Sequence, residues 1–479
     1  MEIKEIIKQR KEKLAGLKAK NGTEYDNSYF SRVNITEAVH NFQEGRKVVL
    51  CGRIMAQRGH GKVSFWDLKD ATGKIQLYLK EDILGKDRFS ALEDLDIADI
   101  IGVKGELFQT HTAEPTVKVE EFVLLSKALR PLPEKWHGLK DVELRYRQRY
   151  LDLMANEEVK QVFLLRTKII QAIRKFLDER GFLEVETPMM HNIPGGAAGR
   201  PFSTHHNEYD LDLYLRIAPE LYLKRLLVAN LDKVYEINRS FRNEGVSTKH
   251  NPEFTMLEVY SAYADYEDMM RLARDLLIFA AREALGETNF IYQGKTVDLA
   301  LDWQKYSFAK IVKEKFDIAP DDSAEVMLKK LQSKGQALGL KRLSRSQVAK
   351  VIEEILEQGM TGNPTFVTDY FTHMCPLAKT KKDNPLISER FELYIAGLEI
   401  GNAYSELNDP LEQEKRFQEE LEDLDKEEKK ALDKDYILAL EHGMPPAGGL
   451  GIGIDRLVML FTDQPSIRDV ILFPLLRPQ

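Results

Sequence analysis

The chain has 479 residues, of which 43% are hydrophobic and 30% are charged. This length exceeds one ordinary hydrophobic core and predicts two or three domains, and no apolar run reaches the ~18–20 residues of a membrane-spanning helix. The charged start lacks a signal-peptide core, and only two cysteines occur, Cys51 and Cys375. We therefore expect a soluble cytoplasmic protein without disulfides. The net charge of −8 argues against a protein that coats nucleic acid through bulk electrostatics, but a local basic patch stays possible.

The first 130 residues predict a helix followed by a small barrel. Residues 1–44 form an N-terminal extension that begins with seven Lys or Arg against three Glu in its first 20 residues, with apolar residues at roughly helical spacing. This helix is either solvated and docked on its neighbour, or it binds nucleic-acid phosphates. Residues 45–130 contain five apolar or β-branched runs separated by Gly, Asp and Pro turns, at 48–55, 63–68, 74–79, 100–107 and 116–125. Five short strands in this length predict an OB-fold barrel.

The rest of the chain predicts one large α+β domain, entered through a linker. Residues 131–150 begin with prolines and end in a basic run, which indicates a stiff connection. In residues 151–479 a helix stops at Gly181, and strand-like runs follow at 182–190, 211–217, 233–244, 253–263, 390–406 and 448–454. Because these runs do not alternate regularly with helices, we expect an antiparallel β-sheet flanked by helices. A helical insertion is predicted at about 305–370 and a charged helix at about 412–435.

A first group of candidate site residues lies on two neighbouring strand-like runs. Alternation along the first run predicts that Arg242 and Glu244 share a face, and a loop then ends near His250. The returning run presents an aromatic ring, a carboxylate and a phenol on one face: Phe254, Glu258 and Tyr260. These groups suit a ligand that combines a phosphate, a flat base and an ammonium group. Structural salt bridges are the alternative interpretation of the same side chains.

A second candidate is a pair of carboxylates, Glu392 and Glu399. If Ala396-Gly397 is a two-residue hairpin turn, Tyr394 pairs with Glu399. Glu392 and Glu399 then lie diagonally on one face, roughly 7–8 Å apart at their backbones. Two converging carboxylates suit a Mg²⁺ ion that bridges nucleotide phosphates. An exposed pair of glutamates without a ligand is the alternative.

A third candidate is the glycine-rich run from Gly448 to Arg456. Its glycines allow a ligand to approach the backbone closely, and Arg456 is expected at the start of the following helix. A dinucleotide-binding fingerprint is excluded, because the spacing is Gly-x-Gly-x-Gly and no acidic ribose partner follows.

Taken together, these runs resemble the signature motifs of class II aminoacyl-tRNA synthetases. Gly181-Phe-Leu-Glu-Val-Glu-Thr-Pro188 is similar to motif 1, which implies a homodimer. Phe241-Arg-Asn-Glu244 with Phe254 is similar to motif 2, and Gly449 to Arg456 is similar to motif 3. Three motifs in this order are far more specific than any one of them.

The predicted barrel extends the resemblance to the subgroup that activates lysine, aspartate or asparagine. Three further segments closely resemble bacterial lysyl-tRNA synthetases: Ile193-Pro-Gly-Gly196, the run from Arg216 to Arg225, and Gly401-Asn-Ala-Tyr-Ser-Glu-Leu-Asn408. The resemblance covers nearly the whole chain, least securely the insertion and the first 20 residues. It implies a ligase that activates L-lysine with ATP to the adenylate and transfers lysine to the 3′ end of tRNA(Lys).

The resemblance also implies a role for each nucleotide-site residue. The implied ATP-binding set is Arg242, Glu244, His250, Phe254 and Arg456. Arg242 and Arg456 are the catalytic pair. Arg242 bridges the amino-acid carboxylate and the α-phosphate, while Arg456 and His250 hold the outer phosphates. Phe254 stacks on adenine, and Glu244 hydrogen-bonds its edge.

For lysine, the resemblance implies that Gly196 and Glu220 receive the α-amino group. The implied side-chain pocket consists of Glu258, Tyr260, Asn402 and Glu406. Electrostatics supports this specificity independently, because Glu258 and Glu406 favour an ammonium group and repel the carboxylate of aspartate.

The resemblance further implies Mg²⁺ as the cofactor, held by Glu392 and Glu399 together with ATP. In the barrel, Phe65 and Gln76 resemble the residues that stack on and read the central anticodon base, expected to be uracil. Three alternatives stay open: a synthetase specific for aspartate or asparagine, a catalytically inactive relative that binds tRNA, and an enzyme that lysylates a protein. The complete ATP-site set argues against the second, and the barrel argues against the third.

Overall fold

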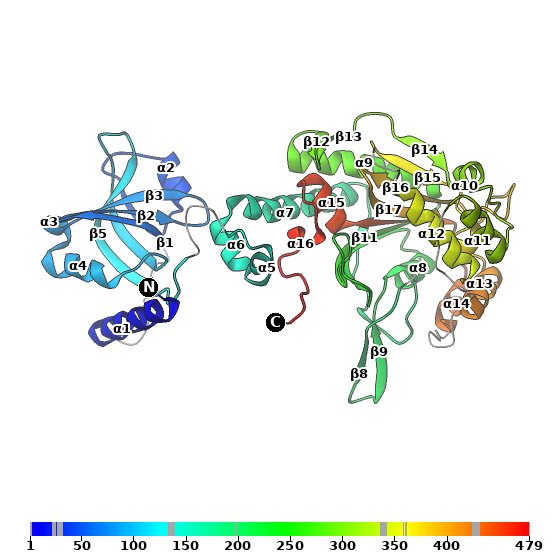
Figure 1. The fold of residues 1–479 in the computed structure, drawn as a ribbon, viewed down its shortest axis with the longest axis horizontal. Coiled ribbons are helices and arrows are strands. Elements are labelled where there is room, and N and C mark those ends of the chain that lie inside the picture. Colours follow the sequence, from blue (N-terminus) through cyan, green and yellow to red (C-terminus); the bar gives the residue numbers. More distant parts are fainter. Residues whose placement is uncertain are drawn as a thin grey trace. The chain divides into compact units, whose positions relative to one another are not determined.

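The computed structural model describes residues 2–21, 25, 32–132, 139–196, 199–335, 343–357, 359, 362–423 and 432–478. These fall into two compact units, residues 1–140 and residues 141–479 (Figure 1). Among the described residues, no helix has both the length and the apolar character needed to cross a lipid bilayer.

The first unit is a closed five-stranded barrel, as the sequence predicted. Its strands are adjacent in the order β1-β2-β3-β5-β4, with bounds Lys47–His60 (β1), Val63–Lys69 (β2), Lys74–Lys80 (β3), Ile100–Gln109 (β4) and Pro115–Ser126 (β5). Alternate residues such as Trp66, Leu68 and Leu77 fill the interior. Short helices accompany the strands: α2 (Ile35–His40), α3 (Glu81–Leu84), α4 (Lys86–Ser90) and the 3₁₀ turn η1 (Ala91–Asp94).

The N-terminal helix α1 (Ile3–Asn21) docks on this barrel through two of its basic side chains. Arg10 Nη1 donates to the carbonyl of Ala128 at 2.8 Å, and Lys13 Nζ donates to Asp96 Oδ1 at 2.9 Å. These contacts agree with the docked-helix interpretation for this part of α1.

The second unit is built on a large mixed sheet. Eight strands follow the order β14-β15-β16-β17-β18-β11-β10-β6, and only the β14–β15 and β10–β6 pairs are parallel. The bounds are Leu183–Glu184 (β6), Lys233–Phe241 (β10), Glu253–Ala262 (β11), Gln304–Ser307 (β14), Thr365–Thr368 (β15), Arg390–Ile395 (β16), Leu398–Ser405 (β17) and Ala447–Gly453 (β18). The mainly antiparallel sheet predicted from the sequence is confirmed.

The two faces of this sheet have different roles. On one face, alternate residues such as Leu257 and Leu450 pack against helices α7 (Glu157–Asp178), α9 (Tyr266–Leu285) and α15 (Ile454–Phe461). The intervening residues, including Glu258, Asn402 and Gly449, point to the opposite face, which we call the site face. Strand alternation therefore sends apolar side chains to the core and polar side chains to the site.

Helices and small sheets cover the edges of the unit. The remaining helices are α5 (Val142–Arg147), α6 (Arg149–Ala155), α8 (Glu220–Val228), α10 (Phe308–Phe316), α11 (Ala324–Ser333), α12 (Arg345–Glu357), η2 (Thr372–Met374), α13 (Pro410–Asp423), α14 (Lys434–Glu441) and α16 (Ile467–Val470). The remaining strands are β7 (Met190–His191), β8 (Ser203–His206), β9 (Leu211–Leu215), β12 (Asn289–Tyr292) and β13 (Lys295–Asp298).

Several predicted boundaries were wrong. The run at 182–190 is not one strand, since only β6 and the start of β7 are extended, and the run at 211–217 joins a separate sheet as β9. The insertion at 305–370 is not wholly helical, because β14 and β15 begin and end it as strands of the main sheet. The charged helix predicted to reach 435 is helical as α13 to Asp423, and residues 424–431 lie outside the described part.

Candidate active site and anticodon surface

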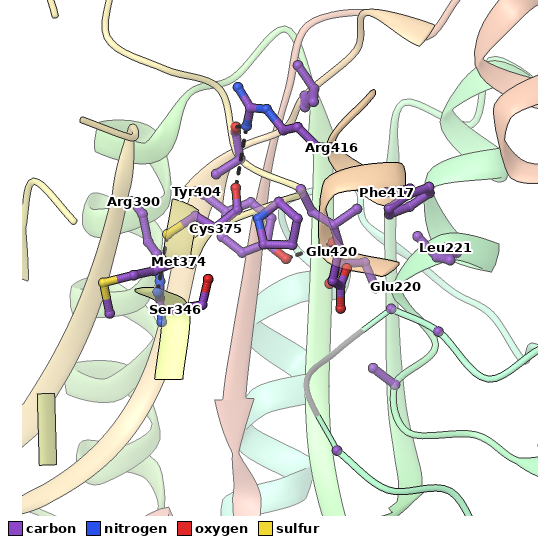
Figure 2. A pocket seen from close by; sticks show the side chains of 18 of the residues that line it. Glu220, Leu221, Ser346, Met374, Cys375, Arg390, Tyr404, Arg416, Phe417 and Glu420 are labelled. Carbon is purple, nitrogen blue, oxygen red and sulfur yellow. Dashed lines mark hydrogen bonds between the residues drawn. The ribbon is translucent and has the colours of Figure 1, made fainter. Parts of the chain in front are cut away.

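A cavity of about 2230 Å³ lies against the site face of the large sheet. Its walls come from the sheet, from the loops around residues 192–201 and 242–245, and from helices α12 and α13. In the view of Figure 2, Glu220 and Arg390 lie on opposite sides of this cavity, with Tyr404 between them. Eight candidate residues line it: Gly196, Glu220, Arg242, Glu244, Glu258, Tyr260, Asn402 and Glu406.

Arg242 and Glu244 lie side by side, although not for the predicted reason. Strand β10 ends at Phe241, so strand alternation does not reach them, and the Glu244 amide instead donates to the Arg242 carbonyl at 2.8 Å. A Cβ atom on Gly199 would lie 3.2 Å from Glu244 Oε1 and 3.3 Å from Arg242 Cδ, so both side chains reach the same place. A tight turn rather than a strand brings the two residues together.

Arg242 is half-buried and positioned to meet an anion. Burial lowers the pKa of its guanidinium, and nearby carboxylates, chiefly Glu244 and Glu399, offset this only in part. Its Nε is buried without a hydrogen-bond partner among the described residues, and the guanidinium carbon lies 5.1 Å from the centre of the Phe254 ring. An anionic ligand would satisfy this cation, and the adjacent ring offers a flat apolar surface.

Arg456 is held at the edge of the same region by two candidate partners. Its Nη1 donates to both the carbonyl and Oε2 of Glu399 at 2.9 Å, and its Nη2 lies 3.2 Å from His250 Nε2. Because Arg456 lies in the first turn of α15, the preceding Asp455 fixes its position. Asp455 accepts from the Thr255 amide at 2.7 Å and from Arg166 Nη1 at 2.6 Å. These two bonds tie the start of α15 to strand β11 and to helix α7.

The hairpin that carries Glu392 and Glu399 has the predicted turn. Ala396 and Gly397 have φ angles of 52° and 87°, and Tyr394 pairs with Glu399. A bulge at Ile400 then shifts the register, so that Glu392 pairs with Asn402. Glu392 accepts from the hydroxyls of Tyr370 at 2.8 Å and Tyr394 at 2.5 Å.

Each of the two glutamates also pairs with an arginine: Glu392 with Arg390, and Glu399 with Arg456. Contact with Arg456 and nearby arginines lowers the pKa of Glu399 although burial opposes this. Within the described residues no three His, Cys, Asp or Glu side chains converge as a self-sufficient metal site. Hard carboxylate oxygens in a pair nevertheless fit Mg²⁺, which commonly takes one or two carboxylates and completes its shell with phosphates and water.

The opposite end of the cavity is a buried acidic pocket. The side chain of Glu406 is fully buried, and Glu220 and Glu258 are 6% and 4% exposed. Tyr404 donates to Glu220 Oε1 at 2.6 Å, and Tyr260 donates to Glu258 Oε2 at 3.0 Å. Burial and the nearby Glu220 carboxylate raise the pKa of Glu258 to about 8. Such a pocket favours a ligand with positive charge.

Gly449 makes room for this pocket. A Cβ atom at this position would lie 1.9 Å from Glu406 Oε1 and 2.6 Å from Tyr260 Cε1. Only glycine therefore allows strand β18 to pass directly behind the two polar side chains.

The two barrel candidates share one outward face. Phe65 pairs with Tyr78 across strands β2 and β3, and Gln76 lies diagonally from Phe65. Phe65, Tyr78 and Phe108 form a row of half-buried rings with centroids 5.2 and 5.6 Å apart. Gln76 accepts from Thr116 Oγ1 at 3.2 Å and donates to Glu114 Oε2 at 3.1 Å. An aromatic row beside a hydrogen-bonding amide can stack on a base and read its edge.

Sequence reasoning missed several residues of the catalytic unit. Arg390 could have been found, because alternation places it on the same face as Glu392 two residues later. Lys224 lies four residues after Glu220, the helical spacing that brings the two side chains together. Glu353 gave no signal, because its approach to Arg390 depends on how the insertion folds back over the sheet.

Comparison with known proteins identifies the family. The model described as "tRNA synthetases class II (D, K and N)" matches residues 141–477, and one described as an "OB-fold nucleic acid binding domain" matches residues 48–125. The chain belongs to the class II tRNA synthetases. This synthetase is similar along its length to proteins named lysine–tRNA ligase. It is 53% identical to one from Carboxydothermus hydrogenoformans, with 100% of this chain and 99% of the relative covered. It is 55% identical to one from Pelotomaculum thermopropionicum (100% and 96%) and 46% identical to one from Halalkalibacterium halodurans (99% and 97%).

Proposed function

We propose that this synthetase activates L-lysine with ATP and transfers it to tRNA(Lys). The observation that carries this proposal is the acidic pocket at the end of the cavity. Glu406 is fully buried; its Oε2 meets the ammonium group of Lys224, and its Oε1 has no hydrogen-bond donor among the described residues. A buried acceptor without a donor is costly, and the ε-ammonium group of lysine would supply donors and charge together.

The site residues then divide the work between two substrates. Glu220 and Gly196 receive the α-ammonium group, while Glu258, Tyr260, Asn402 and Glu406 surround the side chain. Arg242 contacts the carboxylate of lysine and the α-phosphate of ATP. Phe254 and Glu244 hold adenine, and His250 and Arg456 hold the outer phosphates.

The reaction itself needs little proton transfer. The carboxylate of lysine is ionised at neutral pH and can attack the α-phosphate in line, with pyrophosphate leaving. The contribution of the protein is orientation, together with neutralisation of developing charge by Arg242 and Arg456. Mg²⁺, held by Glu392 and Glu399, would neutralise phosphate charge when bound.

The proposal includes partners and location. In the barrel, Phe65 would stack on the central anticodon base and Gln76 would read its edge. We also propose a homodimer formed through the motif 1 segment, a division at residues 44, 130 and 150 into extension, barrel, linker and catalytic domain, and a cytoplasmic location. Cys51 and Cys375 are unpaired and buried, which suits a reducing compartment.

The first experiment is amino-acid-dependent exchange between ATP and labelled pyrophosphate, without tRNA, across all twenty amino acids. Exchange with lysine far above the others is the expected result. Exchange with aspartate or asparagine would preserve the family and overturn the specificity. Absence of exchange with every amino acid, from folded protein with Mg²⁺, would favour a tRNA-binding relative without activity.

A further inference from the structure

Lys224 is a fully buried lysine directly behind the acidic pocket. Its side chain has no exposed surface, and it does not line the cavity. Its Nζ lies 2.6 Å from Glu220 Oε1 and also forms an ion pair with Glu406 Oε2. The pocket thus contains its own ammonium group, on the far side of the two carboxylates from the space where a ligand binds.

The charges in this pocket require such a cation. Glu220, Glu258 and Glu406 are all buried, and Glu220 lies close enough to the other two carboxylates to raise the pKa of each. Burial, together with Glu220 and Glu258, raises the pKa of Glu406 well above its ordinary value, and Lys224 opposes this rise. Burial would also lower the pKa of Lys224, but Glu220 and Glu406 outweigh this and raise it, so Lys224 stays charged.

Other groups around Lys224 do not replace it. Tyr404 donates to Glu220, and its ring centre lies 5.4 Å from the ammonium nitrogen. Among the other cations nearby, Arg225 pairs with Asp433, Arg216 pairs with Glu236, and Arg242 acts on Glu258 rather than on Glu406. The titratable groups that face Lys224 or its carboxylates come from α8, β10, β11, β17 and the residue after it, and α14: Glu220, Glu236, Glu258, Tyr260, Tyr404, Glu406 and Tyr436.

We propose that Lys224 is a positioning residue for substrate selection: its buried ammonium group anchors one oxygen of Glu220 and one of Glu406, favours the charged form of Glu406, and aims the other oxygens of both into the cavity. Glu258, with a pKa of about 8, holds a proton at neutral pH, so Glu220 and Glu406 against Lys224 leave one negative charge; ionisation of Glu258 beside a bound ammonium group supplies the second, which matches the two ammonium groups of L-lysine. Arg242 balances the remaining carboxylate of the substrate. This inference rests on the proposed function, since it concerns the same pocket.

The test is the pH dependence of lysine use by Lys224→Met, a neutral side chain of similar length. Without the internal cation, Glu406 binds its proton more tightly, and a lysine ligand must displace that proton. The KM for lysine in pyrophosphate exchange should therefore rise about tenfold or more at pH 6.5, and the ratio to the unsubstituted protein should fall at least about threefold by pH 8.5. The KM for ATP should change little. Lys233→Met, an exposed lysine at the start of β10, is the matched control.

Two further measurements separate this role from a structural one. Calorimetry of lysine binding in buffers of different ionisation enthalpy should show about one more proton released by Lys224→Met than by the unsubstituted protein at pH 7. Combining Lys224→Met with Glu406→Gln should give a smaller loss than the product of the single losses. If Lys224→Met does not fold, Lys224→Gln provides the same neutral comparison with polar atoms retained.

A lysine KM within twofold of the unsubstituted protein at every pH would overturn the inference, and so would a rise that does not vary with pH. Failure of the proposed function looks different, because the unsubstituted protein would then show no lysine-dependent exchange at all.

Discussion

The barrel and the acidic pocket both hold candidate recognition residues, but these residues differ in charge and in burial. On the barrel, Phe65 and Gln76 are half-buried neutral side chains on the outside of a closed apolar core. In the pocket, Glu258 and Glu406 are buried carboxylates inside the catalytic unit. The barrel can therefore bind a base by stacking and hydrogen bonds without altering its core. The pocket attracts a cationic ligand because the charges of its buried carboxylates are only partly compensated. Specificity in the pocket is coupled to stability and pH, and specificity on the barrel is not.

The largest effect is expected from Glu406→Gln, which removes a pocket charge while keeping the shape of the side chain. The kcat/KM for lysine in pyrophosphate exchange should fall about 100-fold or more, because the variant leaves a substrate ammonium group without its buried partner. Glu419→Gln removes an exposed carboxylate from helix α13 on another wall of the cavity and should cost less than about threefold. Equal losses in the two variants would mean that lysine use depends on the overall negative charge of the cavity and not on a direct contact with Glu406.

Gly449→Ala tests whether displacement of the pocket side chains, without any change in charge, is enough to weaken lysine use. The new Cβ atom meets Glu406 and Tyr260 at distances that no structure tolerates, so both side chains must move. We expect a loss of about 30- to 100-fold in kcat/KM for lysine, on the scale of an overpacked core position. Gly453→Ala on the same strand meets only atoms 3.8 Å away and should cost much less in the KM for lysine. Similar lysine KM values for the two variants would contradict this account.

Phe65→Ala should produce the opposite kinetic signature from the pocket variants. Loss of a stacking ring costs about 1–3 kcal/mol per base, so charging of tRNA should weaken about 5- to 100-fold. Pyrophosphate exchange, which needs no tRNA, should be unchanged. Tyr25→Ala is the control, because Tyr25 is an exposed ring whose hydroxyl accepts from the Lys127 amide, just after strand β5. Phe42→Ala is unsuitable, because that ring packs on the barrel core. A fall in pyrophosphate exchange with Phe65→Ala would show that the barrel and the acidic pocket do not act independently.

The smallest effect is a pH-dependent change in stability at Glu258. Its pKa is about 8 in the folded protein against an ordinary value of 4.5, so the folded state binds more protons between these pH values. Stability contributed at this site therefore falls as pH rises through that window. Glu258→Gln removes the penalty, and its Tm relative to the unsubstituted protein should rise by about 2–4 °C between pH 5.5 and 8.5. Glu419→Gln should show no such trend. A flat difference for Glu258→Gln would mean that this carboxylate is not the protonated group.

The difference between the two regions also explains what could be predicted from the sequence. The barrel strands and the Ala396-Gly397 hairpin depend on local rules of alternation and turn chemistry, and both were predicted correctly. Arg242 and Glu244 came together through a turn that alternation did not foresee. The approach of Glu353 to Arg390 depends on packing between segments far apart in the chain, which periodicity does not encode. The roles of individual site residues came from the family resemblance.

The two-residue hairpin between β16 and β17 has an evolutionary consequence. Ala396 and Gly397 form the turn, and the Ile400 bulge follows at once, so the faces on which Glu399 and Asn402 lie depend on a fixed number of residues. Exposed loops usually tolerate gains and losses of residues. In this loop a single inserted or deleted residue would rotate Glu399 away from Asn402 in one step. Sequence variation among functional descendants should therefore accumulate here as substitutions, while the length of the segment stays constant.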